Sequence, residues 1–301
     1  MASSNIETVD HNWLLFEWPP AYRFPDLLDI PREGEAVLSY QCVPRHYAAL
    51  LDWAYVARNP AERDHTRGLM LMYKHPRVLP NAPRNVIYPV GICVQGFIER
   101  CDLKALGSWN KNKEPHAAIQ HLVLTGGRDC GHVFRQYKSA INEVLKYIYR
   151  ALESPPPTSL KQDDSDQLYL TRRVFTKVNS RNRKQPSALE PGDDPMDMCL
   201  AVQDNWRILE KLNIGTYMPD DVDTLDSCVA PCSAMVVGEG DFVDVCVGFD
   251  IVSRRDRRGG TSIKVHLNIE HVLVLVSGDD TASEVSVEEE EAMVQAPGLR
   301  F

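Results

Sequence analysis

The side chains best suited to chemistry in this chain are cations gathered in two short stretches. The first stretch has no intervening acid and holds Arg172, Arg173, Lys177, Arg181, Arg183 and Lys184. The second is offset only by Asp256 and holds Arg254, Arg255, Arg257 and Arg258. Tyr169 and Phe175 lie beside the first stretch. Cations that follow a phosphate backbone, with rings that stack on bases, are what single-stranded nucleic-acid binding uses.

These two basic stretches therefore predict contact with nucleic acid, most simply single-stranded. The competing interpretation is that loops are usually charged. A basic hairpin tip also keeps a sheet from pairing edge to edge with another sheet. Residue types alone do not separate the two interpretations.

Cysteine and histidine side chains offer a second kind of chemistry. Cys228 and Cys232 are separated by three residues. The same half of the chain also holds Cys199, Cys246, His266 and His271. A zinc site needs about four such ligands around one point, and the single close pair supplies half of them. His266 and His271 are five apart, so a regular strand would place them on opposite faces. We expect buried structural thiols, with no metal and no cofactor.

The segment 125–132 could hold an enzyme site, because it joins an expected strand to an expected helix. Its amide protons and Arg128 could bind an anion at the helix N-terminus, and Cys130 near His132 could suggest a thiol with its base. The segment matches neither the Walker A pattern nor the dinucleotide fingerprint. We expect a tight turn in which Asp129 caps the helix, with no catalytic residues.

Composition indicates a globular protein large enough for one big domain or two ordinary ones, with 301 residues of which 44% are hydrophobic. A net charge of -9 argues against a general polyanion binder, although the charge is uneven. No apolar run reaches the roughly 20 residues that span a bilayer, and residues 1–10 lack a secretion signal. We therefore expect an intracellular protein, cytoplasmic or nuclear, whose cysteines are mostly reduced and which does not enter a membrane.

Two elements must position these groups, a hairpin and a long helix. Apolar and polar residues alternate from Val243 to Ile251 and again from Ile263 to Ile269, on either side of a Gly-Gly pair. Two such runs around a turn predict a β-hairpin. Apolar residues at helical spacing predict a helix over 133–153, and three prolines at 155–157 end it.

Shorter patterns complete the expected fold. They predict helices at 45–58 and 200–212, and strands at 36–42, 69–73, 86–98, 119–124, 168–178 and 229–237. We expect an α+β protein whose first domain, residues 10–153, packs a mixed sheet on the long helix. Residues 154–166 form a linker. Residues 167–277 form a strand-rich domain with the long terminal hairpin, a small open barrel or a sandwich, as in oligonucleotide-binding barrels. One continuous sheet through both halves is the alternative.

The acidic tail, residues 278–301, is expected to be disordered. Its last twenty or so residues, an acidic run followed by an apolar tip, resemble in type the tails of bacterial single-strand binding proteins. The resemblance implies a tail that competes for a basic groove and recruits partners, although Arg300 beside the terminal Phe301 departs from the pattern. The leading hypothesis is a non-enzymatic nucleic-acid binding protein. The alternatives are a self-associating interaction or structural subunit, and an enzyme with its site in 125–132.

Overall fold

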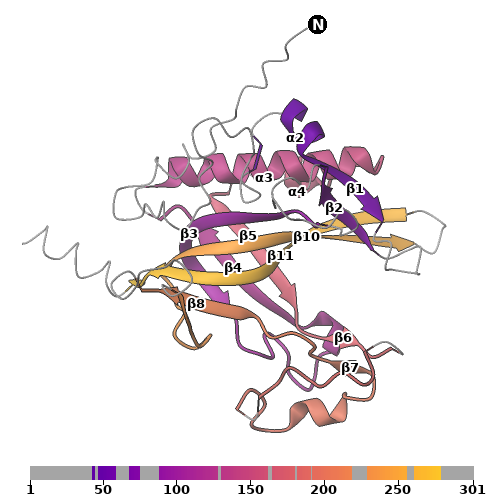
Figure 1. Cartoon of the computed structure of the whole chain (residues 1–301), viewed down its shortest axis with the longest axis vertical. Coiled ribbons are helices and arrows are strands. Elements are labelled where there is room, and N and C mark those ends of the chain that lie inside the picture. Colours follow the sequence, from indigo (N-terminus) through magenta and orange to yellow (C-terminus); the bar gives the residue numbers. More distant parts are fainter. Residues whose placement is uncertain are drawn as a thin grey trace, which may run out of the picture.

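The computed structural model describes residues 43–44, 47–58, 68–74, 88–127, 130–161, 165–179, 182–190, 192–218, 229–255 and 261–278. Most of its strands form one large mixed sheet, with a long helix along one side and a small lobe at the far end (Figure 1). The strands of the sheet are β1 (Ala54–Arg58), β2 (Leu69–Tyr73), β3 (Gly91–Asp102), β4 (Ile119–Thr125), β5 (Gln167–Arg173), β8 (Asn213–Tyr217), β9 (Val229–Pro231), β10 (Phe242–Arg255) and β11 (Thr261–Val276). The predicted combination of a strand-rich sheet with a long helix is confirmed in this coarse form.

The predicted hairpin is the centre of the sheet. β10 and β11 pair antiparallel from Phe242 and Val276 up to Arg255 and Thr261. On its other side β10 pairs with β3, which pairs with β4, which pairs with β5, all antiparallel. β5 meets β11 in parallel at a single residue pair, Thr171 and Asn268. The pairings that start at β10 therefore return to β10.

Strands from both predicted domains alternate in this sheet, so the alternative of one continuous sheet agrees with the pairings. Within the described ranges, residues 167–277 form no barrel or sandwich by themselves, because β3 and β4 lie between β10 and β5. The division at 154–166 stays a prediction about how the chain is organised. That segment includes a short helix, α4 (Thr158–Lys161). The acidic tail from 279 onward lies outside the described residues.

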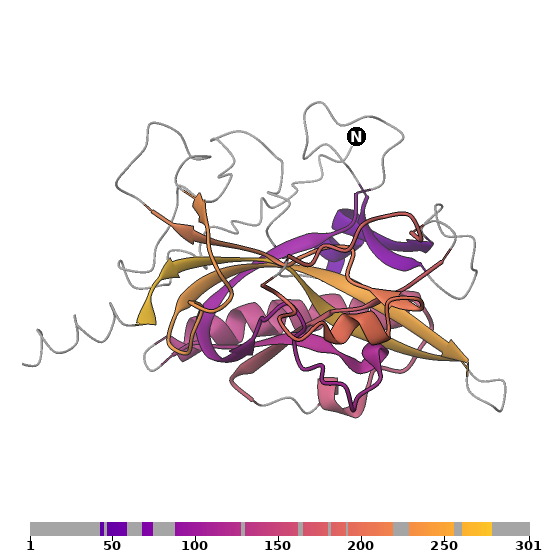
Figure 2. The ribbon, with the colours of Figure 1, turned by 90° about the horizontal axis from the view of Figure 1, so that it is seen from below.

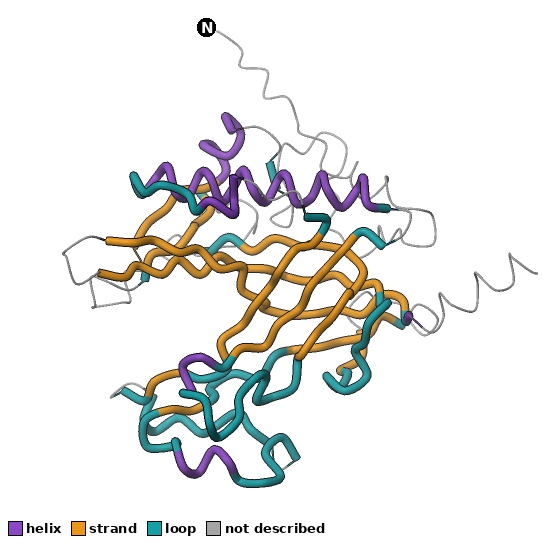
Figure 3. Tube along the Cα trace, turned by 180° about the vertical axis from the view of Figure 1, so that it is seen from behind, coloured by secondary structure: helices purple, strands orange, loops and turns teal. Residues whose placement is uncertain are grey.

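The core forms between the inner face of the hairpin and helix α3 (Gly131–Ala151). Val243, Val245 and Val247 point inward from β10 and are fully buried, as are Phe134 and Ile141 of α3. Each such side chain stabilises the fold by about 1.5–3 kcal/mol relative to exposure. Figures 2 and 3 show α3 running alongside the sheet as a separate layer. The helix predicted over 133–153 is confirmed.

A small lobe follows β5 and carries part of the first basic stretch. Its two short strands, β6 (Thr176–Lys177) and β7 (Trp206–Arg207), pair with each other. A separate apolar cluster supports them, in which the rings of Trp109 and Phe175 lie 4.9 Å apart, between centroids. Two turns of 3-10 helix, η4 (Pro115–Ala117) and η5 (Met198–Ala201), border this cluster. The lobe is the lower part of the molecule in Figure 1.

Several shorter elements differ from their predictions. The helix predicted over 200–212 is wrong: η5 ends at Ala201, and Trp206 then pairs with Lys177 in a strand. The helix predicted over 45–58 covers only α2 (Tyr47–Trp53), after which the chain extends into β1. The strand predicted over 229–237 ends at Pro231. In the first two cases a strand partner elsewhere in the chain, β6 for β7 and β2 for β1, outweighs a weak local pattern. The strand predicted over 36–42 lies outside the described residues.

Candidate nucleic-acid interface

The outer face of β4 and β5 exposes polar and aromatic side chains. Leu122 and Leu170 sit opposite each other and point into the core. Alternation then sends their neighbours outward. Among these, Tyr169 keeps 51% of its surface exposed. Such exposure of a tyrosine in the middle of a paired strand leaves one ring face open to a partner.

Tyr169 stacks against His121 on the neighbouring strand. The ring centroids are 6.1 Å apart and the planes differ by 18°. The register explains the contact, because His121 lies opposite Thr171 and is therefore the diagonal neighbour of Tyr169. The two nearly parallel rings form a platform across two strands.

Cations surround this platform on the same face. Arg100 of β3 lies opposite Val123, which lies opposite Tyr169. On β11, alternation from Asn268 places His266 and Lys264 outward, and both are exposed. We call the outward residues of this surface the β4–β5 patch, which comprises Arg100, His121, Tyr169, Arg173, Lys264 and His266.

Carboxylates also border the β4–β5 patch. A guanidinium nitrogen of Arg173 lies 3.7 Å from a carboxylate oxygen of Asp250, and both side chains are about half exposed. Asp102 lies opposite His121. A phosphate that approached Arg173 would therefore compete with the carboxylate of Asp250. The ion pair between Arg173 and Asp250 contributes little stability, because water screens it.

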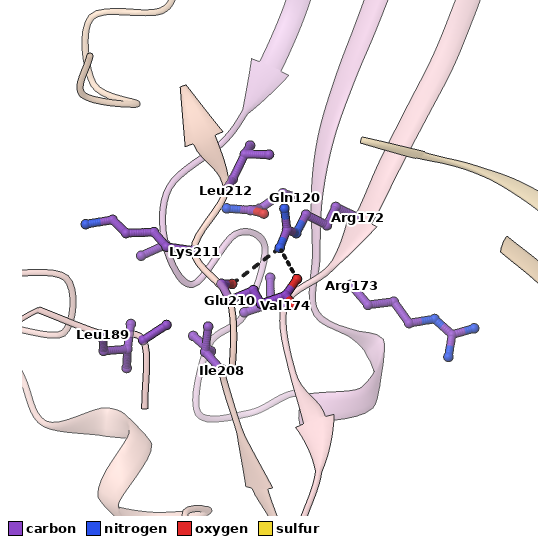
Figure 4. Close-up of a pocket in the computed structure, with 11 residues that line it drawn as sticks. Gln120, Arg172, Arg173, Val174, Leu189, Ile208, Glu210, Lys211 and Leu212 are labelled. Carbon is purple, nitrogen blue, oxygen red and sulfur yellow. Dashed lines mark hydrogen bonds and ion pairs between the residues drawn. The ribbon is translucent and has the colours of Figure 1, made fainter. Parts of the chain in front are cut away.

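Arg172, although predicted as a binding residue, points to the other side of β5 (Figure 4). Its side chain is only 15% exposed and lies 3.7 Å from a carboxylate oxygen of Glu210. It donates long hydrogen bonds to the carbonyls of Glu210 and Glu270, at 3.4 and 3.5 Å. Burial lowers the pKa of Arg172, and the charges of these two glutamates oppose the shift. Arg172 thus joins β5 to the chain around 210, and Arg173 beside it points away to the surface.

The remaining described cations of the first stretch lie in the lobe. Lys177, Arg183 and Lys184 are all exposed. The turn that presents them is held from within: Asn182 donates to the carbonyl of Lys177 at 3.0 Å. Arg207 donates to the carbonyl of Arg183 at 3.1 Å, and to those of Asn182 and Gln185. Sequence reasoning missed this supporting role, because Arg207 lies in another segment with no local signal.

The structure does not bring the two basic stretches into direct contact within the part of the chain that it describes. The second stretch lies at the far end of β10 and β11, where Arg254 and Arg255 pair with Ser262 and Thr261. The side chains of these two arginines lie outside the described residues, as do Arg181, Arg257 and Arg258. Figure 1 shows the ends of β10 and β11 pointing away from the lobe.

Residues 125–127 turn the chain at the end of β4, and α3 begins at Gly131. Thr125 Oγ1 accepts a hydrogen bond from the amide of Gly127 at 2.9 Å. A side chain at Gly126 would meet the backbone of Gly131 at 2.6 Å, so the turn has no space for one. Cys130 is buried in an apolar cluster and His132 is exposed, so they do not line a common site. Arg128 and Asp129 lie outside the described residues.

The prediction about the two histidines of β11 is wrong. An irregularity in the register between β10 and β11 inserts Glu270 as an extra residue. His266 therefore lies opposite Asp250 and His271 opposite Cys246, both on the outer face. Even so, the described residues contain no group of three or more His, Cys, Asp or Glu side chains arranged to hold a metal ion. Cys228 lies outside them.

The chain matches no known family and no curated protein. Two solved structures resemble it in part. Gp2.5, a single-stranded DNA binding protein encoded by bacteriophage T7, has a TM-score of 0.31 at 11% identity, over 62% of this chain and 86% of that one. A single-stranded DNA-binding protein from bacteriophage Enc34, in complex with ssDNA, has a TM-score of 0.26 at 12% identity, over 65% and 93%. In the described part of the chain, no helix has the length and apolar character needed to cross a membrane.

Proposed function

We propose that this protein is a non-enzymatic, intracellular binding protein that holds single-stranded nucleic acid across the β4–β5 patch. The observation that carries the proposal is the half-exposed ring of Tyr169, stacked on His121 in the middle of a strand face. A ring held in this way offers a flat surface on which a base can stack. Stacking of this kind contributes about 1–3 kcal/mol per base and accepts every base.

The circuit of strand pairings supports the same site. In chain order its five strands are β3, β4, β5, β10 and β11, and the last returns to the first through β10. We propose that this circuit is a partly open barrel of the oligonucleotide-binding kind. Such barrels bind their ligand on the face of the second and third strands. Here those strands are β4 and β5, which carry the stacked rings.

The comparison with oligonucleotide-binding barrels also suggests a role for the basic stretches. In oligonucleotide-binding barrels the loops between the first and second strands, and between the fourth and fifth, flank the bound strand. Here the first of these loops exposes Lys104, Lys111 and Lys113. The second contains the arginines of residues 254–258. Lys177, Arg183 and Lys184 of the lobe would extend the path beyond β5.

The charges of the β4–β5 patch set how strongly binding depends on salt. Arg100, Arg173 and Lys264 are its three permanent cations. For single strands the logarithm of affinity falls with the logarithm of salt concentration with a slope of about -0.7 per phosphate neutralised. Three contacts give a slope of about -2. A slope well beyond that would show that the loop cations also contact the strand.

The test is a titration of the full chain with a fluorescent oligothymidylate at two salt concentrations. Tyr169→Ala should weaken binding by about five- to 150-fold, the equivalent of one stacked base. Its salt slope should stay unchanged, because no charge is removed. Arg173→Ser should weaken binding less and reduce the slope by about 0.7. Replacing the four arginines of residues 254–258 with serine should reduce it further.

The matched control is Tyr55→Ala, because Tyr55 is 39% exposed on β1, at the other edge of the sheet. Wild-type affinity in Tyr169→Ala, or no binding by the wild-type protein at low salt, contradicts the proposal. If the wild-type protein does not bind, the alternative of a self-associating subunit is favoured. Met235 and Val236, which are 75% and 70% exposed in the turn after β9, favour that alternative. A molecular mass that rises with protein concentration, without nucleic acid, would then support it.

A further inference from the structure

A row of reactive side chains crosses the outer face of the sheet at a different place from the β4–β5 patch. Cys93 of β3 lies directly opposite Cys246 of β10. Cys246 in turn lies directly opposite His271 of β11. Residues directly opposite each other in antiparallel strands point to the same side. The three strands thus place two thiols and an imidazole in one line.

Glu270 completes this group because of the extra residue in β11. One of its carboxylate oxygens lies 3.8 Å from the sulfur of Cys246. Gly248 leaves the space for it, because a Cβ at this position would clash with a carboxylate oxygen of Glu270. Gly91 likewise has the sulfur of Cys246 near the place a Cβ would take, at 3.5 Å. We call Cys93, Cys246, Glu270 and His271 the thiol cluster.

We propose that Cys246 is a peroxide-reactive thiol, and that Cys93 is the partner with which it closes a cross-strand disulfide. Opposite residues of antiparallel strands have Cα atoms about 4.5–5.5 Å apart. Disulfides span Cα separations of about 4.4–6.8 Å. The bond can therefore form with little movement of the strands. Both cysteines are free thiols that are only partly buried, so a small oxidant can reach them.

Electrostatics around Cys246 favour its thiolate. A hydrogen bond from Cys93 and the imidazole of His271 lower the pKa of Cys246 to about 5, against the opposing effect of burial. The pKa of His271 is raised, mainly by its hydrogen bond to Cys246. The pKa of Cys93 is raised by the hydrogen bond to Cys246 and by burial. Near neutral pH the cluster thus favours a thiolate at Cys246 beside a neutral thiol at Cys93, and the raised pKa of His271 favours its protonated form.

Two carboxyl groups also face the thiolate. Burial raises the pKa of Glu270, and the charge of Cys246 adds to the shift. Burial likewise raises the pKa of Asp244, to about 6. Asp244 accepts a hydrogen bond from Gln95 at 3.1 Å, and these two residues are the next opposite pair on the same face as the two thiols. Both shifts disfavour the ionised form of these acids beside the thiolate.

The chemistry balances with a hydroperoxide as the oxidant. The thiolate of Cys246 attacks the peroxide, the O–O bond breaks, and the leaving alkoxide or hydroxide takes a proton from His271. The sulfur becomes a sulfenic acid, two electrons more oxidised. The thiol of Cys93 then attacks that sulfur, the S–S bond forms, and the hydroxyl group leaves as water with the proton of Cys93. Two thiols and one peroxide give one disulfide, one alcohol or water, and one water.

The pH profile separates this thiol from an ordinary one. At pH 6 a thiol of pKa about 5 has a thiolate fraction about 300-fold greater than one of pKa about 8.5, and an intrinsic nucleophilicity about 40-fold lower. The net advantage is about eightfold. Above pH 6 the reaction of Cys246 should level off, because its thiolate is fully formed. The rate of an ordinary thiol rises about tenfold per pH unit there, until it nears its own pKa.

The test exposes the full wild-type chain to hydrogen peroxide at pH 6 and at pH 8, followed by peptide mass spectrometry. We expect a linked pair of peptides containing Cys93 and Cys246, two hydrogens lighter than the reduced pair. Cys93→Ser should instead leave a sulfenic acid on Cys246 that dimedone traps. His271→Asn should restore a steep rise in rate between pH 6 and pH 8. Cys199→Ser is the matched control and should change nothing, because burial raises the pKa of Cys199 to about 12.

The wild-type peptide map tests the proposal without any variant. Oxidation that begins at Cys130, Cys199 or Cys232 while Cys246 stays reduced would overturn it. So would a rate at Cys246 that rises tenfold per unit from pH 6 to pH 8. A Cys246 that oxidises first but links to no other cysteine would overturn the role of Cys93. None of these outcomes depends on nucleic-acid binding.

Discussion

The β4–β5 patch and the thiol cluster lie on the same outer face of one sheet, yet they treat polar groups in opposite ways. In the β4–β5 patch, the side chains of Arg173 and its partner Asp250 are 54% and 43% exposed. Beside the thiol cluster, Asp244 keeps only 6% of its surface exposed and Gln95 only 2%. Water screens the first group of charges, whereas burial raises the pKa of Asp244 in the second. The difference shows that alternation along a strand sets the side to which a side chain points. Burial then sets whether water screens its charge.

The pairing of the strands accounts for part of this difference. β10 is bordered along most of its length by β11 and, over its first half, by β3. β5 is bordered fully by β4, but it meets β11 at one pair only, Thr171 and Asn268. The surface around Tyr169 therefore remains open on its β11 side. The open surface around Tyr169 leaves room for a ligand, whereas the paired strands on both sides of β10 hold the side chains of the thiol cluster close together.

The largest effect expected from this comparison is a pH-dependent gain in stability in Asp244→Asn. The pKa of Asp244 in the folded protein is about 6, above the unfolded value of 3.8. Below pH 3.8 the carboxyl is neutral in both states and costs nothing. Between pH 3.8 and 6 only the unfolded state ionises, so the stability of the wild-type protein falls. Two pKa units correspond to about 3 kcal/mol. Urea unfolding should show the advantage of the variant growing by about that amount from pH 4 to pH 7.

Asp250→Asn is the control that makes this comparison sharp. Asp250 lies on the same strand and the same face as Asp244, but it is exposed and paired with Arg173. Its replacement should change the free energy of unfolding by less than about 0.5–1 kcal/mol at any of these pH values. Equal pH dependence of the free energy of unfolding in the two variants would show that burial does not raise the pKa of Asp244.

A smaller effect separates the two faces of β5. Arg172→Ala should lower the free energy of unfolding by about 1–2 kcal/mol, because it removes a largely buried guanidinium that holds Glu210 and two carbonyls. Arg173→Ala should lower it by less than about 0.5 kcal/mol, because its ion pair is exposed. Denaturant unfolding of both variants measures the difference. Equal losses would mean that the two arginines share one environment.

The long periodic elements were predictable from sequence, because their patterns are strong locally. The hairpin and α3 follow from alternation and from helical spacing over many residues. The inward turn of Arg172 also had a signal, since Leu168 and Leu170 share its parity on β5. Its partner Glu210 had no such signal, because that contact depends on a loop far along the chain, between β7 and β8.

The sites themselves were mostly not predictable. Cys93 and Cys246 lie far apart in the chain, and the pairing of β3 with β10 alone brings them together. The extra residue Glu270 depends on how β10 and β11 pair, and it reverses the expected direction of His271. Of the predicted binding residues, Arg173 lies in the β4–β5 patch, whereas its neighbours in the patch come from four strands, β3, β4, β5 and β11. No continuous run of residue types marks such a surface.

The smallest effect concerns the ring stack itself, and it tests whether the platform is preformed. A double-mutant cycle of His121→Ala and Tyr169→Ala should give a coupling energy of about 0.5–1 kcal/mol in the free energy of unfolding, because the ring centroids lie 6.1 Å apart in a stacked arrangement. The control cycle combines Tyr169→Ala with Lys74→Ala, since Lys74 contacts Asp52 and the carbonyl of Leu51 instead. That pair should be additive within about 0.3–0.5 kcal/mol. A coupling no larger than in the control would mean that the rings meet without holding each other. The flat surface that a base needs would then form only when nucleic acid binds, and the loss in affinity of Tyr169→Ala would include that ordering.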